Sequence, residues 1–311
     1  MNNIDLAPQQ KGMTLVEIMI ALVLGVFLIA GVIHIFLGSK QTYRMQENFA
    51  RLQENGRFAM DFISRDIRMA DSLGCLKGGL ADISKKNKTS YPAFTKGVNG
   101  IEGASNAPDT ITLIGIDGGK GALVTSQTAI AGGITVTSGS DLMAGNIALV
   151  ADCNQGDIFK INSVSGNVVS QDASSGQDVT KIYGSDASIY PLKASEYSIG
   201  TDSRGQLSLF RALNGDMPKK LVEGIEDMQI LYGVDTNADH TPEYYVPADQ
   251  VKVITNDMDK VVSIRVRLLV ATVEDNLAAE DLDYAFNGVT RTDRKLRREF
   301  SSTVAVRNRL P

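Results

Sequence analysis

An apolar segment near the N-terminus constrains this chain more than any other feature. From Ile18 to Leu37 every residue except His34 is apolar, glycine or alanine. A helix of about 20 such residues is roughly 30 Å long, which matches the hydrocarbon core of a bilayer. A secretory signal peptide has a shorter apolar core followed by a small-residue cleavage site, whereas polar sequence of helical character follows here. The sequence therefore predicts a retained membrane anchor.

The charges beside the anchor do not decide its orientation. Asp5 and Lys11 precede it, and Lys40 and Arg44 follow it. The positive-inside rule by itself favours a cytoplasmic location for the residues after the anchor. Other observations are needed to assign the side of the membrane.

Beyond Gly38 the pattern becomes that of an amphipathic helix. Apolar or small residues recur at steps of three and four, with charged residues between them. These positions are Phe49, Leu52, Gly56, Ala59, Met60, Ile63 and Ile67. Because no proline interrupts Met13 to Leu73, we expect one long helix whose second half packs one stripe against a C-terminal sheet.

The composition argues against nucleic-acid binding and against catalysis. The formal net charge is −5, whereas general nucleic-acid binders are basic. The two histidines, His34 in the anchor and His240 in a polar segment, are not placed for a Ser-His-Asp arrangement. With no nucleophile–base pair in sight, we expect a protein that is not an enzyme.

Two cysteines, Cys75 and Cys153, lie outside any metal-binding spacing. They are either two buried free thiols or a structural disulfide, and the disulfide requires an oxidising compartment. A bond between them would close a loop of nearly eighty residues. In the chain-entropy model such a loop contributes roughly 4–5 kcal/mol to stability.

Short β-rich segments separated by turn residues follow Gly74. We expect strands at 110–116, 133–137, 146–151, 157–162, 206–212, 227–234, 260–273 and 299–306. In the 260–273 segment Ile264, Val266 and Leu268 alternate with polar residues, as in a half-buried strand. These segments predict an antiparallel sheet on the amphipathic half of the helix, and loops or peripheral strands at 117–145 and 163–180.

One polar segment has the spacing of a calcium loop. Its oxygen-bearing side chains at positions 1, 3, 5, 7 and 9 are Asp235, Asn237, Asp239, Thr241 and Glu243. Hard oxygens that converge from a tight turn suit Ca²⁺, which makes calcium the one candidate cofactor. His240 and Val246 depart from the EF-hand pattern at positions 6 and 12. The alternative is an Asp/Asn-rich hairpin loop between the 227–234 strand and Tyr244–Val246.

The junction before the anchor resembles a known processing site. Lys11-Gly12 followed by Met13-Thr14-Leu15-Val16-Glu17 is similar to the prepilin peptidase site of type IV pilins and type II secretion pseudopilins. The resemblance implies cleavage between Gly12 and Met13, N-methylation of Met13, and Glu17 as the fifth mature residue. It also implies a leader at 1–12, a transmembrane and filament-core helix at 13–37, a helical half at 38–73 that packs on the head, and a periplasmic head at 74–311.

Further segments resemble PilW-type minor pilins. They are QENGRFAMDFISRDIRMADSLGC at 53–75, residues 150–159 around Cys153, residues 221–235, and VAVRNR at 304–309. The blocks lie in family order, and residues 84–145 contain none that can be placed. The resemblance implies the α+β type IV pilin fold, with a long N-terminal helix on an antiparallel β-sheet head.

The same resemblance implies a function, partners and a location. It implies a minor pilin that primes assembly at or near the pilus tip and supports twitching motility and adhesion. The implied partners are other minor pilins, the major pilin, a tip adhesin, the prepilin peptidase and the inner-membrane assembly platform. The leader would be cytoplasmic and the head periplasmic in a Gram-negative bacterium, where Cys75 and Cys153 can oxidise. The alternative is a minor pseudopilin of a type II secretion tip complex.

Glu17 fits this interpretation physically. Glu17 lies one turn into the helix and can reach the membrane interface, so its charge costs less free energy than a charge at the middle of the bilayer would. In a filament it becomes buried and needs a partner, and the α-amino group of a neighbouring subunit's Met13 is a suitable one. The alternative is a tolerated glutamate at the membrane edge.

The cluster at Arg291, Arg294, Lys295, Arg297 and Arg298 is strongly basic. We expect a solvated loop here, and the alternative is a contact with another pilin or with DNA.

Overall fold

The computed structural model describes residues 12–76, 79–80, 82–83, 94, 96–118, 121–138, 141–172, 179–255 and 258–310. Residues 1–11 of the predicted leader lie outside this set, as do 84–93 within the unmatched 84–145 segment. The chain forms two compact units, Met1–Ala50 and Arg51–Pro311. Each unit is described separately below.

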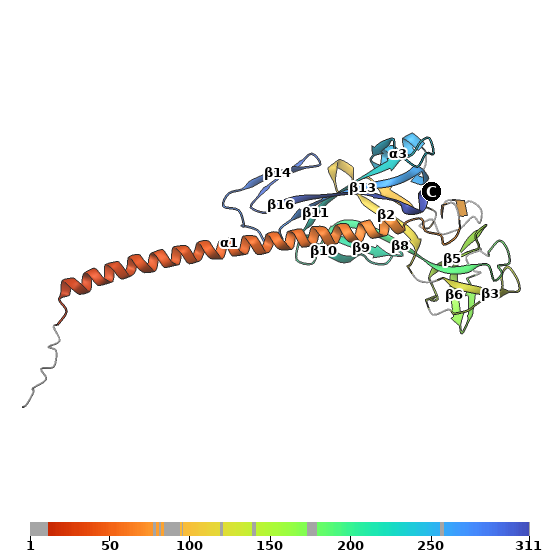
Figure 1. Cartoon of the computed structure of the whole chain (residues 1–311), viewed down its shortest axis with the longest axis horizontal. Helices are drawn as coiled ribbons and strands as arrows, with labels where there is room; N and C mark the ends of the chain where they lie inside the picture. Colours follow the sequence, from red (N-terminus) through yellow and green to blue (C-terminus); the bar gives the residue numbers. More distant parts are fainter. Residues whose placement is uncertain are drawn as a thin grey trace, which may run out of the picture. The chain divides into compact units, whose positions relative to one another are not determined.

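One helix, α1 (Leu15–Met69), contributes to both units (Figure 1). Its apolar part is long and apolar enough to cross a membrane, by length and composition. The single long helix predicted from Met13 to Leu73 is confirmed, although it ends at Met69. Shortly after that end, Asp71 adopts a left-handed φ of 60°, a conformation that commonly follows the last turn of a helix.

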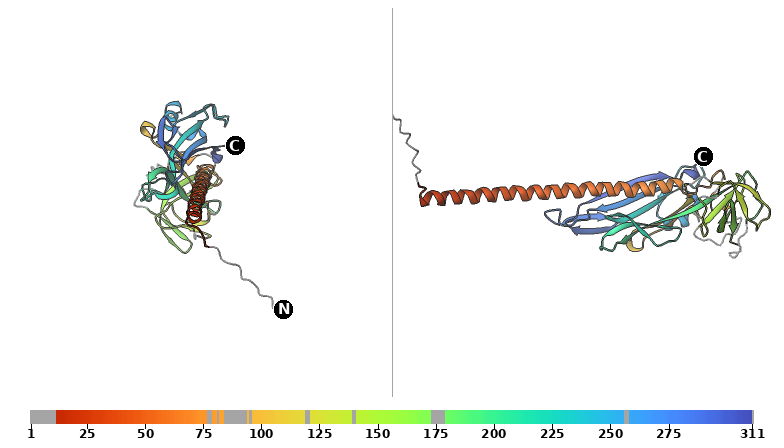
Figure 2. Two further views of the ribbon diagram at one scale, coloured as in Figure 1. Left: turned by 90° about the vertical axis from the view of Figure 1, so that its left-hand side faces the viewer. Right: turned by 90° about the horizontal axis from the view of Figure 1, so that it is seen from below.

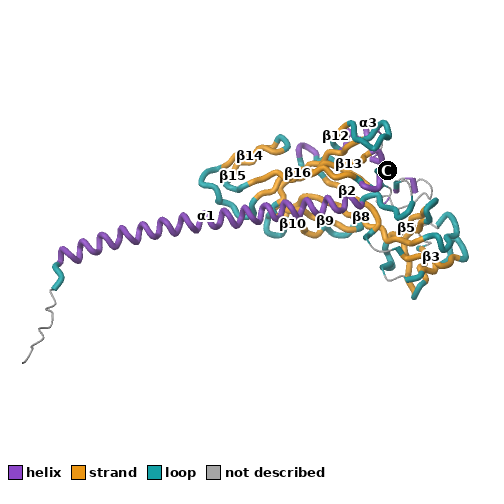
Figure 3. Tube along the Cα trace, in the orientation of Figure 1, coloured by secondary structure: helices purple, strands orange, loops and turns teal. Residues whose placement is uncertain are grey.

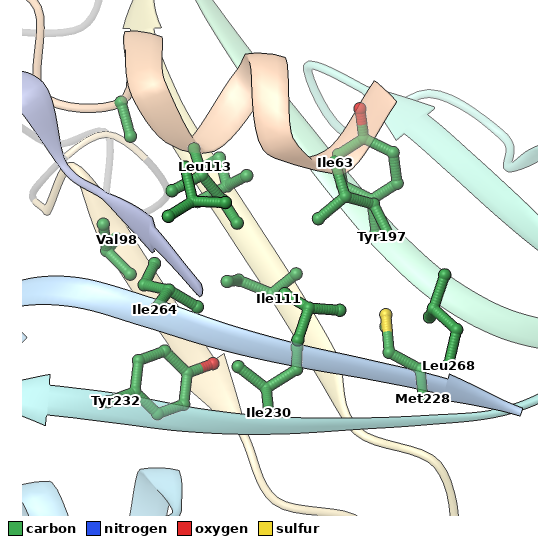
Figure 4. Packing of buried hydrophobic residues seen from close by; sticks show 14 of the residues in the cluster. Ile63, Val98, Ile111, Leu113, Tyr197, Met228, Ile230, Tyr232, Ile264 and Leu268 are labelled. Atoms are coloured by element: carbon green, nitrogen blue, oxygen red, sulfur yellow. The ribbon is translucent and has the colours of Figure 1, made fainter. Parts of the chain in front are cut away.

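In the second unit most of the predicted stripe of α1 is buried, although Met60 is half-buried, and Phe49, in the first unit, is 38% exposed. Ala59, Ile63 and Ile67 are 0% exposed, and their spacing of four residues places them on one helical face. Figure 4 shows Ile63 near Tyr197, within a core that draws residues from strands of two sheets. Gly56 lies on the same side of the helix, where a Cβ atom would stand 2.4 Å from the ring of Phe300. A larger residue here would require the Phe300 ring to shift.

The smaller of the two sheets has the order β12-β11-β13-β16 and is antiparallel throughout. Its strands are β12 (Tyr244–Val246), β11 (Ile225–Val234), β13 (Val261–Ala271) and β16 (Arg297–Ala305). The alternation predicted for β13 is confirmed, because Ile264, Val266 and Leu268 are fully buried while Arg265 and Arg267 are half-buried.

Part of a ten-stranded sheet shares this core. It consists of β1 (Val98–Ile101), β2 (Thr110–Ile116), β8 (Ser188–Thr201), β9 (Leu207–Leu213) and β10 (Lys219–Glu223), paired in that order. Gly115 of β2 meets the helix end, where a Cβ atom would lie 2.4 Å from the Met69 carbonyl oxygen. The head therefore packs two sheets with the helix, not the single sheet that the sequence predicts.

The rest of the ten-stranded sheet closes into a small barrel. The first residues of β8 pair with both β3 (Ala122–Gln127) and β5 (Ile147–Ala151). From β3 the pairing continues through β4 (Ile134–Val136), β7 (Val168–Gln171) and β6 (Gly156–Ser165) back to β5. These green strands form a group apart from the blue strands of the four-stranded sheet (Figure 2). The described residues of 117–145 and 163–180 thus supply barrel strands that enclose a core of their own.

Shorter elements complete the second unit. A hairpin pairs β14 (Leu282–Phe286) with β15 (Val289–Asp293). Helix α3 (Ala248–Thr255) follows β12 and lies near the C-terminus (Figure 3). Single 3₁₀ turns are η2 (Ala104–Asn106), η4 (Met258–Lys260) and η5 (Arg307–Arg309).

Candidate processing, assembly and ion-binding sites

The start of α1 lies directly after the predicted cleavage point. Thr14 precedes the helix, and its Oγ1 accepts a hydrogen bond of 3.3 Å from the backbone N–H of Glu17. Glu17 is the third residue of α1, so the pair has the Ser/Thr-x-x-Glu spacing of a capping box. The acid also lies at the positive end of the helix dipole. A chain that began at Met13 would retain this cap, which the Thr14 hydroxyl provides.

The side chains that follow are exposed along the anchor. Leu15 is 74% exposed, Phe27 72% and Ile35 73%. No described atom lies within 4 Å of a Cβ built on Gly12, Gly25 or Gly31, so packing inside this chain does not require glycine at these positions. In the first unit this helix has its apolar surface available to lipid or to other subunits.

Cys75 and Cys153 form a disulfide, with a Cα–Cα distance of 5.0 Å. Cys75 follows the end of α1, and Cys153 lies in the turn between β5 and β6 of the barrel. Both residues are exposed. A small apolar cluster that includes Leu73 and Ala151 lies beside the bond. The disulfide interpretation of the two cysteines is therefore confirmed, and free thiols are excluded.

The C-terminal RNR segment binds the residues at the end of α1 through side-chain hydrogen bonds and an ion pair. Asn308 donates through Nδ2 to the Ala70 carbonyl oxygen at 2.9 Å. Arg309 donates through Nε to Asp71 Oδ2 at 2.8 Å and through Nη1 to the Val261 carbonyl oxygen at 3.0 Å. The side chains of this pair are 7% and 3% exposed. The pair joins the helix end to the RNR segment. The sequence predicts this motif by resemblance but does not predict its contact with α1.

Three of the five predicted calcium ligands converge. Carboxylate oxygens of Asp235, Asp239 and Glu243 lie within 4.8 Å of one another. The other two take part in local hydrogen bonds: Thr241 donates its N–H to Asp239 Oδ1 at 2.8 Å, and Asn237 Oδ1 accepts the N–H of Asp239 at 2.9 Å. The loop joins β11 to β12, as the hairpin interpretation predicts.

The Asp235 carboxylate holds the loop together. Its Oδ1 accepts the N–H groups of Asn237 and Ala238, and its Oδ2 accepts that of His240. Burial by itself raises the pKa of Asp235, but these N–H donors outweigh it and lower the pKa overall. Both oxygens of this carboxylate are thus engaged inside the loop, and calcium binding stays a prediction.

Calcium titration tests that prediction. We expect about 10 mM calcium to stabilise the full chain by about 1 kcal/mol, the linkage expected for a weak extracellular site. The Asp239→Asn variant should lose this stabilisation because it removes one of the converging charges. The measurement is the midpoint of thermal unfolding with and without calcium, with magnesium as the control ion. An unchanged wild-type midpoint contradicts the prediction.

The predicted solvated basic loop is wrong for two of its arginines, Arg291 and Arg297. Arg291 lies on β15 and donates through Nη2 to Asp227 at 3.0 Å. Arg297 begins β16, is 3% exposed in its side chain, and pairs with Glu226 at 2.7 Å and Asp293 at 2.6 Å. Its guanidinium lowers the pKa of Asp293 to about 2. Both arginines form ion pairs with acids of the same chain, and the spacing of residues in the sequence does not predict these pairs.

Two protein-family models match segments of this chain. Residues 196–308 match Type IV Pilus-assembly protein W, and residues 8–33 match the prokaryotic N-terminal methylation motif. These matches support a PilW-type minor pilin. Among solved structures it is similar to a type IV-like pilin from Thermus thermophilus, with 11% identity, a TM-score of 0.35, and coverage of 84% of this chain and 98% of that one. Proteins with curated descriptions gave no match.

The matched segments fall on distinct parts of the chain. The 196–308 match starts within β8 and includes the four-stranded sheet and most of the C-terminal segment. The 8–33 match includes the start of α1 and the predicted cleavage point. The barrel strands from β3 to β7 lie outside both matches. The predicted α+β architecture, with a long N-terminal helix and an antiparallel head, is confirmed.

Proposed function

We propose that this PilW-type pilin primes type IV pilus assembly and occupies a position at or near the pilus tip, with roles in twitching motility and adhesion. One observation carries the proposal. The helix that begins within the methylation motif is capped by Thr14 and has an exposed apolar surface. Such a surface suits lipid before assembly and the helices of other pilins afterwards.

Cleavage and methylation give this helix the N-terminus that it has in the filament. The prepilin peptidase removes residues 1–12, and the new N-terminus at Met13 is methylated. Residues 13–37 then hold the pilin in the inner membrane of a Gram-negative bacterium, while residues 38–73 pack on the head at 74–311 in the periplasm. The disulfide between exposed Cys75 and Cys153 supports an oxidising compartment for the head.

In the filament Glu17 pairs with the α-amino group of a neighbouring subunit's first residue. The partners are other minor pilins, the major pilin and a tip adhesin, brought together at the inner-membrane platform. A buried ion pair adds little net stability, but removing one partner leaves a buried charge and costs about 3–5 kcal/mol. Glu17 therefore sets the register of assembly.

Two substitutions at one position test this role. Glu17→Ala removes the charge and most of the side chain, whereas Glu17→Gln removes the charge and keeps a side chain of similar size. We expect both variants to lose surface pili and twitching by at least about tenfold, because about 3–5 kcal/mol of assembly energy is lost. Glu54→Gln, an exposed glutamate later in α1, should behave as wild type.

Mass spectrometry of the mature N-terminus controls for processing. Methylated Met13 should be present in wild type and in the Gln variant. Normal piliation and twitching in Glu17→Gln would contradict the charge pairing, and an intact Met1 in wild type would contradict the processing route. A loss of type II secretion with pili intact would favour the pseudopilin alternative.

A further inference from the structure

The strand β16 lies at one end of the four-stranded sheet and has an open edge. It pairs with β13 on one side. On the other side it pairs with no strand among the described residues. Of the described elements, β13 alone packs along the length of β16. Neither the processing site, the disulfide nor the Asp235–Glu243 loop uses this edge.

Alternate residues of β16 point their backbone groups to the open edge. Val306 donates its N–H to the Val262 carbonyl oxygen at 2.9 Å, and Leu296 accepts the N–H of Thr272 at 2.9 Å. Because hydrogen-bonded pairs alternate along an antiparallel ladder, the even-numbered residues of β16 bond to β13. The odd-numbered residues point their N–H and C=O groups away from it. They are Glu299, Ser301, Thr303 and Ala305.

These outward backbone groups are available to another chain. Within the described part of the chain no hydrogen bond is made by the N–H groups of residues 299, 301, 303 and 305. Ser301, Thr303 and Ala305 are exposed. The edge therefore offers a row of donors and acceptors that water alone satisfies in the isolated chain.

The other open strand edges are short or irregular. Proteins block such edges with short strands, bulges, lysines or prolines. β10 has a register shift between Lys220 and Val222, and the remaining strands with an open edge are at most five residues long: β1, β12, β14 and β15. By contrast β16 has nine residues in unbroken register with β13. Residues 300–305 contain no charge and no proline, so nothing in this stretch prevents the addition of a strand.

Exposed arginines lie at both ends of this stretch. Arg298 and Arg307 are exposed, and neither forms an ion pair with a described residue. Arg298 lies over the ring of Phe300 at 5.7 Å. Glu299 does not neutralise Arg298, because it pairs with Arg267 at 2.7 Å. An added strand with an acidic residue at each end would therefore meet an unpaired guanidinium at each end.

We propose that the open edge of β16 binds an extended segment of another protein, which adds to the sheet as a strand and has an acidic residue at each end. Backbone hydrogen bonds supply the affinity in such strand addition, and the side chains supply the specificity. A second copy of this chain fits less well. In a fully overlapped antiparallel pair of two β16 strands, Arg298 of each copy would lie at the same end as Arg307 of the other, and like charges repel. This inference does not depend on the proposed role in pilus assembly.

A synthetic peptide as long as the open stretch 299–305 tests the proposal. The probe is acetyl-Asp-Thr-Val-Thr-Val-Thr-Asp-amide, added to the full chain in detergent micelles. The readout is the hydrogen exchange of single backbone amides, with β11 as an internal reference. We expect about 1 mM peptide to slow the exchange of the Ser301 and Ala305 amides by about tenfold and to leave β11 unchanged. A peptide with lysine in place of both aspartates should bind at least about fivefold more weakly.

Two substitutions at one position separate the backbone from the side chain. Thr303→Pro removes an N–H that points to the open edge and keeps the hydrogen bonds to β13, whereas Thr303→Ala keeps this N–H. Both variants lose the Oγ1 that accepts a hydrogen bond from Arg265 Nε at 3.1 Å. The peptide should protect Ser301 and Ala305 in the alanine variant and leave them unprotected in the proline variant. If Thr303→Pro does not fold, Ser301→Pro and Ser301→Ala form the matched pair instead.

Unchanged exchange of these amides in wild type overturns the proposal, and so does full protection in the proline variant. Equal binding of the two peptides overturns the acidic class of partner. Protection of Ser301 that rises with protein concentration in the absence of peptide would identify a second copy as the occupant, which also overturns the proposal.

Discussion

Replacing both Cys75 and Cys153 with serine is expected to lower the free energy of unfolding by roughly 4–5 kcal/mol. The bond spans a sequence separation of 78 residues. Without this cross-link the unfolded chain has much more conformational entropy, which lowers the stability of the folded state. The measurement is urea unfolding of the full chain in micelles, with wild type under oxidising conditions as the reference. Changing both residues avoids a free thiol that could pair with another subunit.

The position of the bond predicts where the loss appears first. It joins the segment after α1 to the β5–β6 turn, so the barrel should become less protected from hydrogen exchange than β11 and β13. A reducing agent should destabilise wild type and leave the double variant unchanged. A stability loss below about 1 kcal/mol would contradict the entropic account.

Breaking the buried pair at the end of α1 is expected to cost about 3–5 kcal/mol. Arg309→Ala leaves the Asp71 carboxylate, 3% exposed, without its guanidinium partner. It also removes the hydrogen bond from Arg309 to the Val261 carbonyl oxygen. Urea unfolding of the full chain in micelles is again the measurement.

A double-mutant cycle isolates the charge pair. Asp71→Asn is the suitable partner variant because asparagine tolerates the left-handed backbone at this position. We expect the double variant to lose less than the sum of the two single losses, since neither charge is left unpaired. Arg307→Ala, which alters an exposed neighbour, should change stability by less than about 0.5 kcal/mol. Additive losses in the cycle would show that Arg309 and Asp71 do not act as a pair.

Strands with a strong local pattern could be predicted, and strands defined by distant partners could not. The predicted strand at 110–116 is β2, and the alternating 260–273 segment contains β13. By contrast β8 was missed, because Pro191 and several polar residues interrupt its pattern. This strand pairs with β2, β3, β5 and β9. Its conformation is fixed by those neighbours more than by its own sequence.

The functional residues divide in the same way. Gly12, Met13 and Glu17 are predicted from the resemblance of a short local motif to a prepilin peptidase site, and the cap at Thr14 follows from the equally local Thr14-x-x-Glu17 spacing. The prediction of a solvated basic loop was wrong because Arg297 and Arg291 pair with Glu226 and Asp227. These acids lie 71 and 64 residues away in the sequence. No spacing rule reaches such pairs.

By itself the sequence determined the long helix, its apolar and amphipathic halves, and the motif at its start. These features depend on helix periodicity and on neighbours within a few turns. Only the tertiary structure decided that Cys75 meets Cys153, that Arg309 closes the end of α1, and that 122–171 contains most of a barrel. Each of these depends on contacts between residues far apart in the chain, where burial and pairing outweigh local preference.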